Sequence, residues 1–465
     1  MRSWLLVLSV GLFGCPASHR YAQLIRREAS PPPVTVFRDV RVFTATDTIA
    51  LEHHDVRVEG GRITAIAPTG LDVTGARVIE GAGKTLVPGY VDFHAHLTGS
   101  PAPPWAVAWP DEDHNGRALL ASGVTSVMDV GGEVDKLKAL WKRQGDPSWL
   151  GPRFTYSGQI VSLRDGYPTS MVKILYPWPA SALADQRFSG PVSNPLEASA
   201  AVDWRLHHGA HHIKLAIASV PLNAQTMPPE LVSAAVKRAH EKGVKAVAHT
   251  DSAVHALRAA RAGIDALMHG IHLGELTVAD AQELKAAGVV VSPTLVVFDR
   301  AEQLVQFRFA PTEVERRLYP ESFLTPFSPD VARTKTLDPQ LMEWLGKLQE
   351  DHDKRVAAVK TLYDAGVPIL VGSDAAGSIG CLAGGAFLDE LRLLSLAGIP
   401  NADVLRGATV LPARFIAGPN ADFGTIEAGK RADLVLLDGD PLADITVTSR
   451  IANIMQGGVL IEKVD

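Results

Sequence analysis

The chain has 465 residues, of which 46% are hydrophobic and 21% charged, and its formal net charge is −6. This composition is that of an ordinary globular protein, and it excludes a disordered tail, a coiled coil and a collagen-like fibre. No long basic run is present, so nucleic acid is not an expected partner. The two cysteines, Cys15 and Cys381, are too few to hold this length of chain together. The length predicts a large barrel with an accessory domain, or two to three domains, stabilised by a buried core.

The N-terminus has the pattern of an export signal. Met1 and Arg2 precede an apolar run, Trp4 to Phe13, that is too short to cross a bilayer. The run leads into Leu12-Phe13-Gly14-Cys15, which resembles the bacterial lipoprotein signal, in which the cysteine carries the lipid. Simple secretion, or retention of the segment as an anchor, are alternatives that the same pattern allows.

We therefore expect residues 1–14 to be a signal peptide, Cys15 to be lipidated and residues 15–33 to be a polar tether. The protein would then be exported to the bacterial cell envelope, on the periplasmic side or the outer surface, with the lipid as its contact with the membrane. A homo-oligomer is compatible with the sequence.

Short apolar segments near both ends of the chain predict β-strands that assemble into one small β domain. The segments are Val34–Phe37, Asp55–Val58, Arg62–Ile66, Ala76–Ile79, Gly424–Ile426, Asp433–Leu437, Ile451–Met455 and Val459–Ile461. Gly60-Gly61 is typical of a hairpin turn between two of them. We expect residues 34–86 and 419–465 to form this β-sandwich.

Between these ends, residues 87–418 alternate strand and helix patterns, which favours a (β/α)8 barrel of the TIM type. The strands are predicted at Thr125–Asp129, His212–Ala216, Ala246–His249, Ala266–His269, Val289–Val291 and Ile369–Gly372. Two stretches without clear periodicity, 177–194 and 307–339, are expected as insertions over the active face.

Chemistry-bearing residues follow the predicted strands. His94 and His96 point to the same face of their strand, because side chains alternate, and such a pair suits a metal ion. Alone, the pair is as consistent with two exposed histidines. However, His249, His269 and Asp374 also end predicted strands, and the carboxyl ends of barrel strands meet at one mouth.

Lys214 lies within a predicted strand between Ile213 and Leu215, so its side chain points opposite to theirs, into the barrel. Nearby cations and burial lower the pKa of such a lysine. A neutral lysine can add CO2 to form a carbamate, which can bridge two metal ions. A lysine that pairs with a carboxylate, or that turns outward, is the alternative.

Several motifs together resemble the metal-dependent amidohydrolase superfamily, from about Val34 to Asp465. The matching pieces are Val87–His96, Ile213-Lys214, Ala248-His249, Met268–Gly270, Gly372–Ala375 and Gly424–Val435. The resemblance implies a (β/α)8 barrel with a β-sandwich and two zinc ions per chain. Manganese, cobalt or iron can occupy the same kind of site.

Carried over from that superfamily, His94, His96 and Asp374 would hold one zinc ion, and His249 and His269 the other. Carboxylated Lys214 and a hydroxide would bridge the two ions. Two Lewis acids lower the pKa of the bridging water and polarise the substrate carbonyl. Asp374 would then serve as the catalytic base and acid.

Gly123–Gly132 resembles the imidazolonepropionase-like branch, which includes bacterial dipeptidases that cut Xaa-Pro or Xaa-Arg peptides. Lys214 favours the dipeptidase side, because imidazolonepropionase itself usually lacks a bridging lysine. Met128 stands where members usually carry Arg, and Asp165–Tyr167 replaces a Gly-Gly-His loop. Tyr167 or Arg164 is a candidate to hold a substrate carboxylate; an ordinary surface loop is the alternative.

The sequence thus predicts an amidohydrolase that cleaves an amide bond in a dipeptide or an N-acyl amino acid. A hydrolase of cyclic amides, carbamates or lactones on the same site is the nearest alternative. A binding lipoprotein without catalysis is disfavoured because all six ligand groups are present. Deamination is disfavoured because no His-x-x-Glu motif accompanies the His249 strand.

Overall fold

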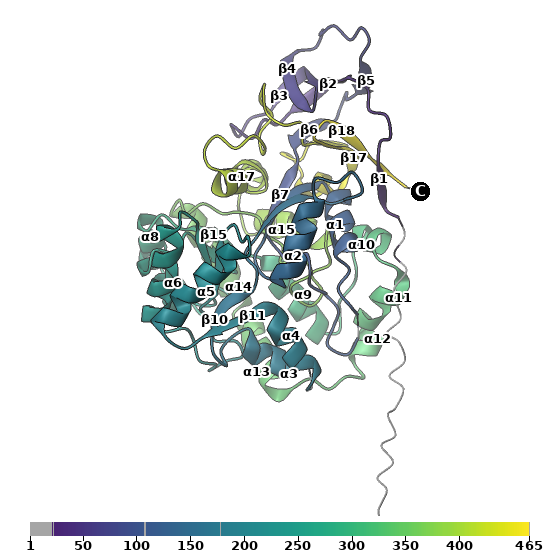
Figure 1. Cartoon of the computed structure of the whole chain (residues 1–465). Helices are drawn as coiled ribbons and strands as arrows, with labels where there is room; N and C mark the ends of the chain where they lie inside the picture. The colour runs from purple at the N-terminus through teal and green to yellow at the C-terminus, as the bar shows by residue number, and fades with distance from the viewer. Residues whose placement is uncertain (1–20, 22, 107, 177, 465) are drawn as a thin grey trace, which may run out of the picture.

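The computed structural model describes residue 21 and residues 23–106, 108–176 and 178–464. Within these ranges the chain forms a barrel with a β domain packed against one end of it (Figure 1). The predicted signal peptide and Cys15 lie outside the described residues. Among the residues that are described, none of the helices combines the length and the apolar character needed to cross a bilayer.

The barrel is built from parallel strands, as the sequence predicted. Its strands are β7 (Tyr90–Ala95), β8 (Val124–Asp129), β9 (Arg153–Tyr156), β10 (Ile160–Leu163), β12 (Ile213–Ala216), β13 (Ala246–His249), β14 (Ala266–Met268) and β15 (Val290–Ser292). β9 pairs with β8 and β10 pairs with β12, so these two strands share one position in the barrel. β7, β8, β12 and β13 are buried along their whole lengths, because one face meets the barrel interior and the other meets helices.

The extended segment 369–374 closes the barrel between β15 and β7. The Leu370 N–H donates to the Val291 carbonyl at 2.8 Å, and the Phe93 N–H donates to the Val371 carbonyl at 2.9 Å. The predicted strand at Ile369–Gly372 is present here only as an extended segment with isolated bridges at Ile369 and Ala375. This closure brings Asp374 beside the end of β7.

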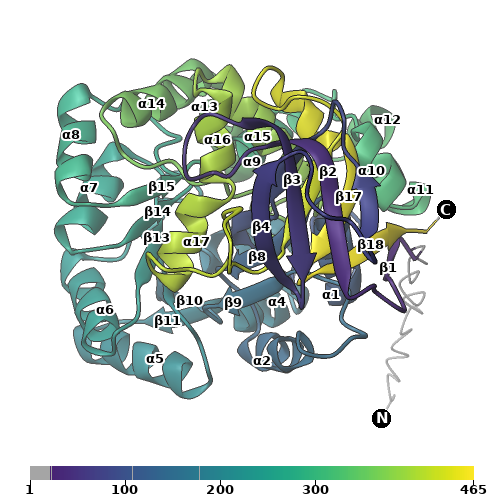
Figure 2. The same cartoon turned by 90° about the horizontal axis from the view of Figure 1, so that it is seen from above.

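Helices surround the strands and cover their outer side (Figure 2). They are α1 (Glu112–Ala121), α2 (Val134–Arg143), α5 (Pro195–His207), α6 (Pro229–Glu241), α7 (Ala253–Arg261), α8 (Val278–Ala286), α14 (His352–Asp364), α15 (Gly385–Leu396), α16 (Asn401–Gly407) and α17 (Val410–Ala417). Their starts carry local signals: Asn194 caps α5 by accepting the Glu197 N–H at 3.0 Å, and proline occupies the first turn.

The two predicted insertions contain short elements of their own. The helix α3 (Thr169–Leu175) precedes the first predicted insertion, which holds α4 (Ala180–Phe188) and the strand β11 (Ser189–Val192), and β11 pairs with β10. The second follows α9 (Leu295–Val305) and holds α10 (Glu313–Leu318), α11 (Glu321–Leu324), η1 (Thr325–Phe327) and α12 (Pro329–Ala332), before α13 (Pro339–Glu350).

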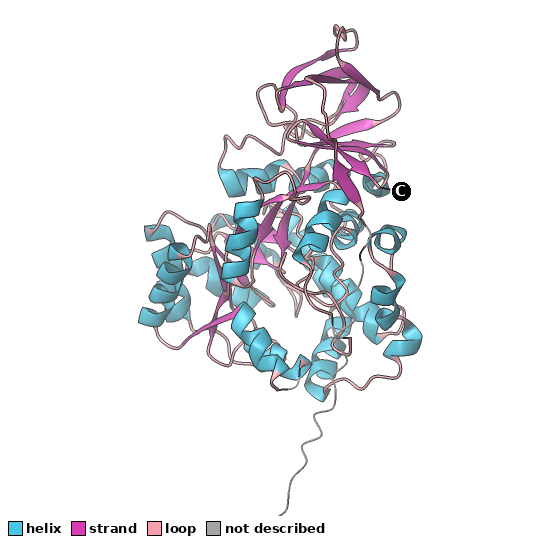
Figure 3. Ribbon diagram, turned by 45° about the vertical axis from the view of Figure 1, so that its right-hand side comes forward, coloured by secondary structure: helices cyan, strands magenta, loops and turns pink. Residues whose placement is uncertain are grey.

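The β domain combines both ends of the chain, as predicted: its strands are purple and yellow in Figure 1, and Figure 3 shows them gathered at one end of the molecule. Its elements are β1 (Ile25–Arg27), β2 (Val34–Val42), β3 (Leu51–Glu59), β4 (Arg62–Pro68), β5 (Arg77–Glu80), β6 (Thr85–Pro88), β16 (Leu434–Leu437), η2 (Ile445–Ser449), β17 (Ile451–Gln456) and β18 (Val459–Lys463). β6 pairs with β16, which joins the N-terminal strands to the C-terminal ones. Gly60 and Gly61 form the predicted hairpin turn, and both have positive φ angles, 58° and 78°.

Two local expectations differ from the structure. The predicted tether includes Ile25–Arg27, but these residues form β1 and pair with β18. The polar residues on both sides of Ile25 led to the prediction of a tether, but the Ile25 side chain is fully buried. The segment Gly424–Ile426, predicted as a strand, is a loop in which the Ile426 N–H donates to the Thr44 carbonyl at 3.1 Å.

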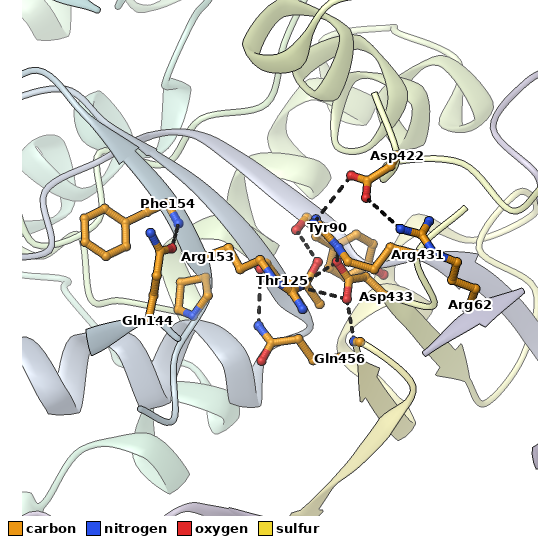
Figure 4. A network of polar contacts seen from close by, with 12 residues as sticks. Arg62, Tyr90, Thr125, Gln144, Arg153, Phe154, Asp422, Arg431, Asp433 and Gln456 are labelled. Atoms are coloured by element: carbon orange, nitrogen blue, oxygen red, sulfur yellow. Dashed lines mark hydrogen bonds and ion pairs between the residues drawn. The ribbon is translucent and has the colours of Figure 1, made fainter. Parts of the chain in front are cut away.

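Polar contacts join the barrel to the β domain (Figure 4). Arg153 of β9 donates to both carboxylate oxygens of Asp433, at 3.0 and 2.9 Å. The Gln456 side chain donates to the Thr125 and Gly151 carbonyls, at 3.3 and 3.1 Å. These contacts therefore tie the barrel strands β8 and β9 to the C-terminal part of the β domain.

Candidate metal centre

The structure brings the six predicted ligand residues together at the carboxyl ends of the barrel strands. His94 lies in β7, Lys214 in β12 and His249 at the end of β13. His96 directly follows β7, and His269 directly follows β14. Asp374 ends the closing segment 369–374. All six are buried.

His94 and His96 both face the same carboxylate. Their Nε2 atoms lie 3.2 and 2.9 Å from Oδ1 of Asp374. Burial alone would raise the pKa of Asp374, but the two imidazoles hold it well below its usual range. For His96, burial lowers the pKa, and the contact with Asp374 outweighs it and raises the pKa. Asp374 is therefore a carboxylate at neutral pH.

His249 and His269 form the other side of the cluster. Their ring centroids lie 4.2 Å apart, and the ring of His269 lies 4.6 Å from that of His94. Burial lowers the pKa of both His249 and His269 well below the usual value, so both are neutral. Ligand atoms of His94, His269 and Asp374 all lie within 4.8 Å of one another. Neutral imidazoles with one carboxylate are a donor set that a divalent transition metal prefers.

Lys214 is the unusual member. Its Nζ atom is buried and has no hydrogen-bond partner among the described residues. Burial lowers its pKa to about 7, against a smaller opposing effect of Asp374. A buried ammonium without a partner is costly, whereas a neutral amine is suited to carbamate formation. The unpartnered Nζ of Lys214 and Nε2 of His249 thus fit the presence of a metal group between these side chains.

Neighbouring groups orient two of the ligand rings. Nδ1 of His96 lies 2.6 Å from the Gly131 carbonyl, and Nδ1 of His269 lies 2.7 Å from the Thr294 hydroxyl. Such outer contacts hold a ligand ring in one tautomer and one orientation. Sequence reasoning missed Thr294, because its position two residues after β15 resembles an ordinary start of a helix.

Asp92 joins the two segments that carry His94 and Asp374. One of its carboxyl oxygens accepts the His94 N–H at 3.1 Å and the Ser373 N–H at 3.0 Å. Burial raises the pKa of Asp92 to about 7. Its place in the Val91–His96 motif was the available signal, and the prediction gave it no role.

The two candidate substrate residues have different positions. The ring of Tyr167 lies 4.4 Å from that of His249, so Tyr167 borders the cluster. Burial raises the pKa of Tyr167, which keeps its hydroxyl protonated. Arg164 is exposed, and its Nε donates to the Ser193 hydroxyl at 3.0 Å. The structure therefore brings Tyr167, and not Arg164, into contact with the ligand residues.

Comparison with known proteins gives consistent results. Residues 85–461 match the model of the amidohydrolase family. A solved structure of an uncharacterized protein has a TM-score of 0.73 at 25% identity and covers 93% of this chain and 100% of that one. A Xaa-Pro dipeptidase structure with bound methionine has a TM-score of 0.72 at 20% identity and covers 92% of this chain and 99% of its own.

Curated relatives match over shorter stretches. A D-hydantoinase of Streptomyces coelicolor is 37% identical over 100 residues, which is 20% of this chain and 20% of that enzyme. The chain thus aligns with about a fifth of the length of this relative. The family match, in contrast, extends from β6 through the barrel to β18 and includes every predicted ligand residue. The chain belongs to the amidohydrolase family.

Proposed function

We propose that the chain is a metal-dependent hydrolase that cleaves carbon–nitrogen amide bonds, in dipeptides or N-acyl amino acids. The observation that carries the proposal is the unpartnered, buried amine of Lys214 beside Asp374 and the histidine rings. Burial suppresses the charge of Lys214, and a structural lysine would instead have a partner for its ammonium.

In this proposal His94, His96 and Asp374 would hold one zinc ion, and His249 and His269 would hold a second. The neutral Lys214 amine would form an N–C bond to CO2 and release one proton, and the resulting anionic carbamate would be a further ligand of the metal. Bound zinc ions supply a Lewis acid for the scissile carbonyl and a water of lowered pKa.

Asp374 then moves the proton of the reaction. Its carboxylate accepts a proton from the attacking water and donates it to the departing nitrogen. The low pKa of Asp374 keeps its carboxylate ionised, so that it is free to accept the proton. Its buried position keeps bulk water from competing for that proton. Tyr167, beside His249, is placed to donate a hydrogen bond to a substrate oxygen.

Two classes of substrate are compatible with this site. The fold shared with a Xaa-Pro dipeptidase supports dipeptides. The stretch shared with a D-hydantoinase supports the second candidate, hydrolysis of a cyclic amide, a carbamate or a lactone. Tyr167 favours the first, because a phenol hydroxyl suits the free carboxylate of a dipeptide. We further propose that the enzyme works outside the cytoplasm and that a lipid on Cys15 anchors it to the membrane.

The test is the metal content of the chain from residue 16 onward, in the wild type and in Lys214→Ala. The matched control is Lys237→Ala, which removes an exposed lysine of α6. We expect about two metal ions per chain in the wild type and the control, and fewer in Lys214→Ala. Hydrolysis is then measured on dipeptides, N-acetyl amino acids, hydantoins and carbamates.

Two metal ions with release of amino acids would support the dipeptidase proposal. Two metal ions with cleavage of only hydantoins or carbamates would support the second candidate. A wild type with one metal ion or none would contradict the lysine bridge.

A further inference from the structure

His272 is a buried imidazole that neither the ligand set nor the proton transfer uses. It lies three residues after His269, and 1% of its surface is exposed. Its ring centroid lies 6.4 Å from the rings of both His249 and His269, at interplanar angles of 89° and 83°. The ring of His272 is therefore nearly perpendicular to both ligand rings and lies directly beside them.

The ring is held in this place by packing. It stacks on Phe298 with a centroid distance of 4.3 Å and an angle of 26°. The Arg355 guanidinium lies 5.0 Å from the Phe298 centroid. The backbone N–H of His272 donates to the Asp251 backbone carbonyl at 2.9 Å. The stack and the backbone contact restrict the imidazole to one orientation.

Packing does not explain the two nitrogen atoms of the ring. Neither Nδ1 nor Nε2 of His272 makes a well-formed hydrogen bond among the described residues, and the contact of the ring with the His269 backbone is a weak one. The nearest acid, Asp251, is already engaged: its carboxylate accepts the Ser219 N–H at 2.6 Å and contacts His255. Each buried polar atom without a partner costs about 1–3 kcal/mol, and phenylalanine would stack equally well without that cost.

We propose that His272 is a substrate-binding residue whose ring nitrogen forms a hydrogen bond with an uncharged amide group of the substrate, next to the bond that is cleaved. This inference rests on the proposed amidohydrolase function. The ring of His272 lies 6.4 Å from that of His249, whose Nε2 also has no hydrogen-bond partner among the described residues.

The chemistry of the ring selects an amide in preference to a carboxylate. The ring is 1% exposed and makes no well-formed hydrogen bond, and such burial disfavours its charged form. A neutral imidazole offers one donor and one acceptor, which matches the N–H and carbonyl of an amide. A substrate carboxylate would need a cation, which this ring does not supply.

The experiment compares three variants. His272→Phe keeps the stack on Phe298 and removes both nitrogen atoms, whereas His272→Asn and His272→Gln restore an amide at the approximate place of Nδ1 or Nε2. The control is His352→Phe, which changes a half-exposed histidine of α14 that contacts Glu302. Metal content, thermal midpoint, KM and kcat are measured for each on the amides that the wild type cleaves.

We expect His272→Phe to retain the wild-type metal content and to lose about 10- to 100-fold in kcat/KM, mainly through KM. One of the two amide variants should have a kcat/KM within a few-fold of the wild-type value. The control His352→Phe should have the wild-type kcat/KM. A wild-type kcat/KM in His272→Phe, or a loss of metal in proportion to activity, would overturn the inference while the proposed function stands. If the metal-loaded wild type cleaves none of the amides, the proposed function fails and the inference fails with it.

Discussion

Thr294 shows how a single residue serves the site at the expense of its local structure. It occupies the N-cap position of α9, but its side chain forms no capping hydrogen bond and its φ angle is 48°. Its hydroxyl instead lies 2.7 Å from Nδ1 of His269. A threonine in the left-handed region is strained, and such strain is found where function requires it.

We predict that Thr294→Val weakens metal binding by about 10- to 100-fold, because the valine has the same shape but cannot hold the His269 ring. Thr361→Val is the matched control, since the Thr361 hydroxyl donates to the Ala357 carbonyl on the exposed side of α14, away from the ligand residues. Competition of each variant with a chelator measures the affinity. Equal metal retention in Thr294→Val and in the wild type would contradict the assigned role.

At the scale of elements, α9 obtains its N-cap from another helix. Glu390 of α15 accepts the Val296 N–H at 2.7 Å, in the first turn of α9. The Glu390 side chain is fully buried, and burial raises its pKa to about 8. The carboxyl is therefore protonated in the folded protein at pH 7, whereas it is ionised in the unfolded chain.

This shift makes stability depend on pH. Between the usual pKa of a glutamate and about 8, the folded state binds one more proton than the unfolded state, so its stability falls as pH rises. We predict that Glu390→Gln removes up to about 1.4 kcal/mol per pH unit of this decline, because the amide is neutral at every pH. Denaturation at pH 6, 7.5 and 9 measures the effect. The exposed Glu343→Gln on α13 should keep the wild-type slope; an unchanged slope in Glu390→Gln would refute the prediction.

The same elements show how far the sequence alone could lead. His94, His249, His269 and Asp374 were predictable, because they end strands that parallel packing must bring to one mouth. Lys214 was predictable from the alternation of its strand. These inferences needed only local periodicity and the geometry of a closed barrel.

Other features depend on contacts between distant segments, which no local pattern reveals. From the sequence, Glu390 is one acidic residue in an amphipathic helix, and Thr294 is an ordinary first residue of a helix. Ile25 reads as part of a polar tether until β18, at the other end of the chain, pairs with its strand. His272 carries no spacing signal beyond its closeness to His269. In each case the residue's role comes from its tertiary partner.

At the scale of the whole molecule, the barrel and the β domain share one buried carboxylate (Figure 4). Asp433 accepts hydrogen bonds from Arg153 of the barrel, from Arg431 at 2.6 Å and from the Gly457 N–H at 2.7 Å. Its own backbone carbonyl accepts the Gly89 N–H at 2.8 Å, one residue before β7 begins. The β domain thereby holds the strand that carries His94 and His96.

We predict that Arg153→Met destabilises the whole chain by about 1–2 kcal/mol, since Asp433 keeps two donors but loses its barrel partner. Methionine retains the packing of the arginine stem, so the change reports on the charged contact. The control is Arg26→Met: the Arg26–Glu462 pair is exposed, at 64% and 43%, and its loss should change stability by less than about 0.5 kcal/mol. Urea denaturation followed by circular dichroism measures both. If the two domains unfold together, Arg153→Met lowers the urea midpoint of a single unfolding transition. A second unfolding transition at lower urea would mean instead that the β domain is stabilised mainly by its own core. Equal stability of the two variants would show that Asp433 does not couple the domains.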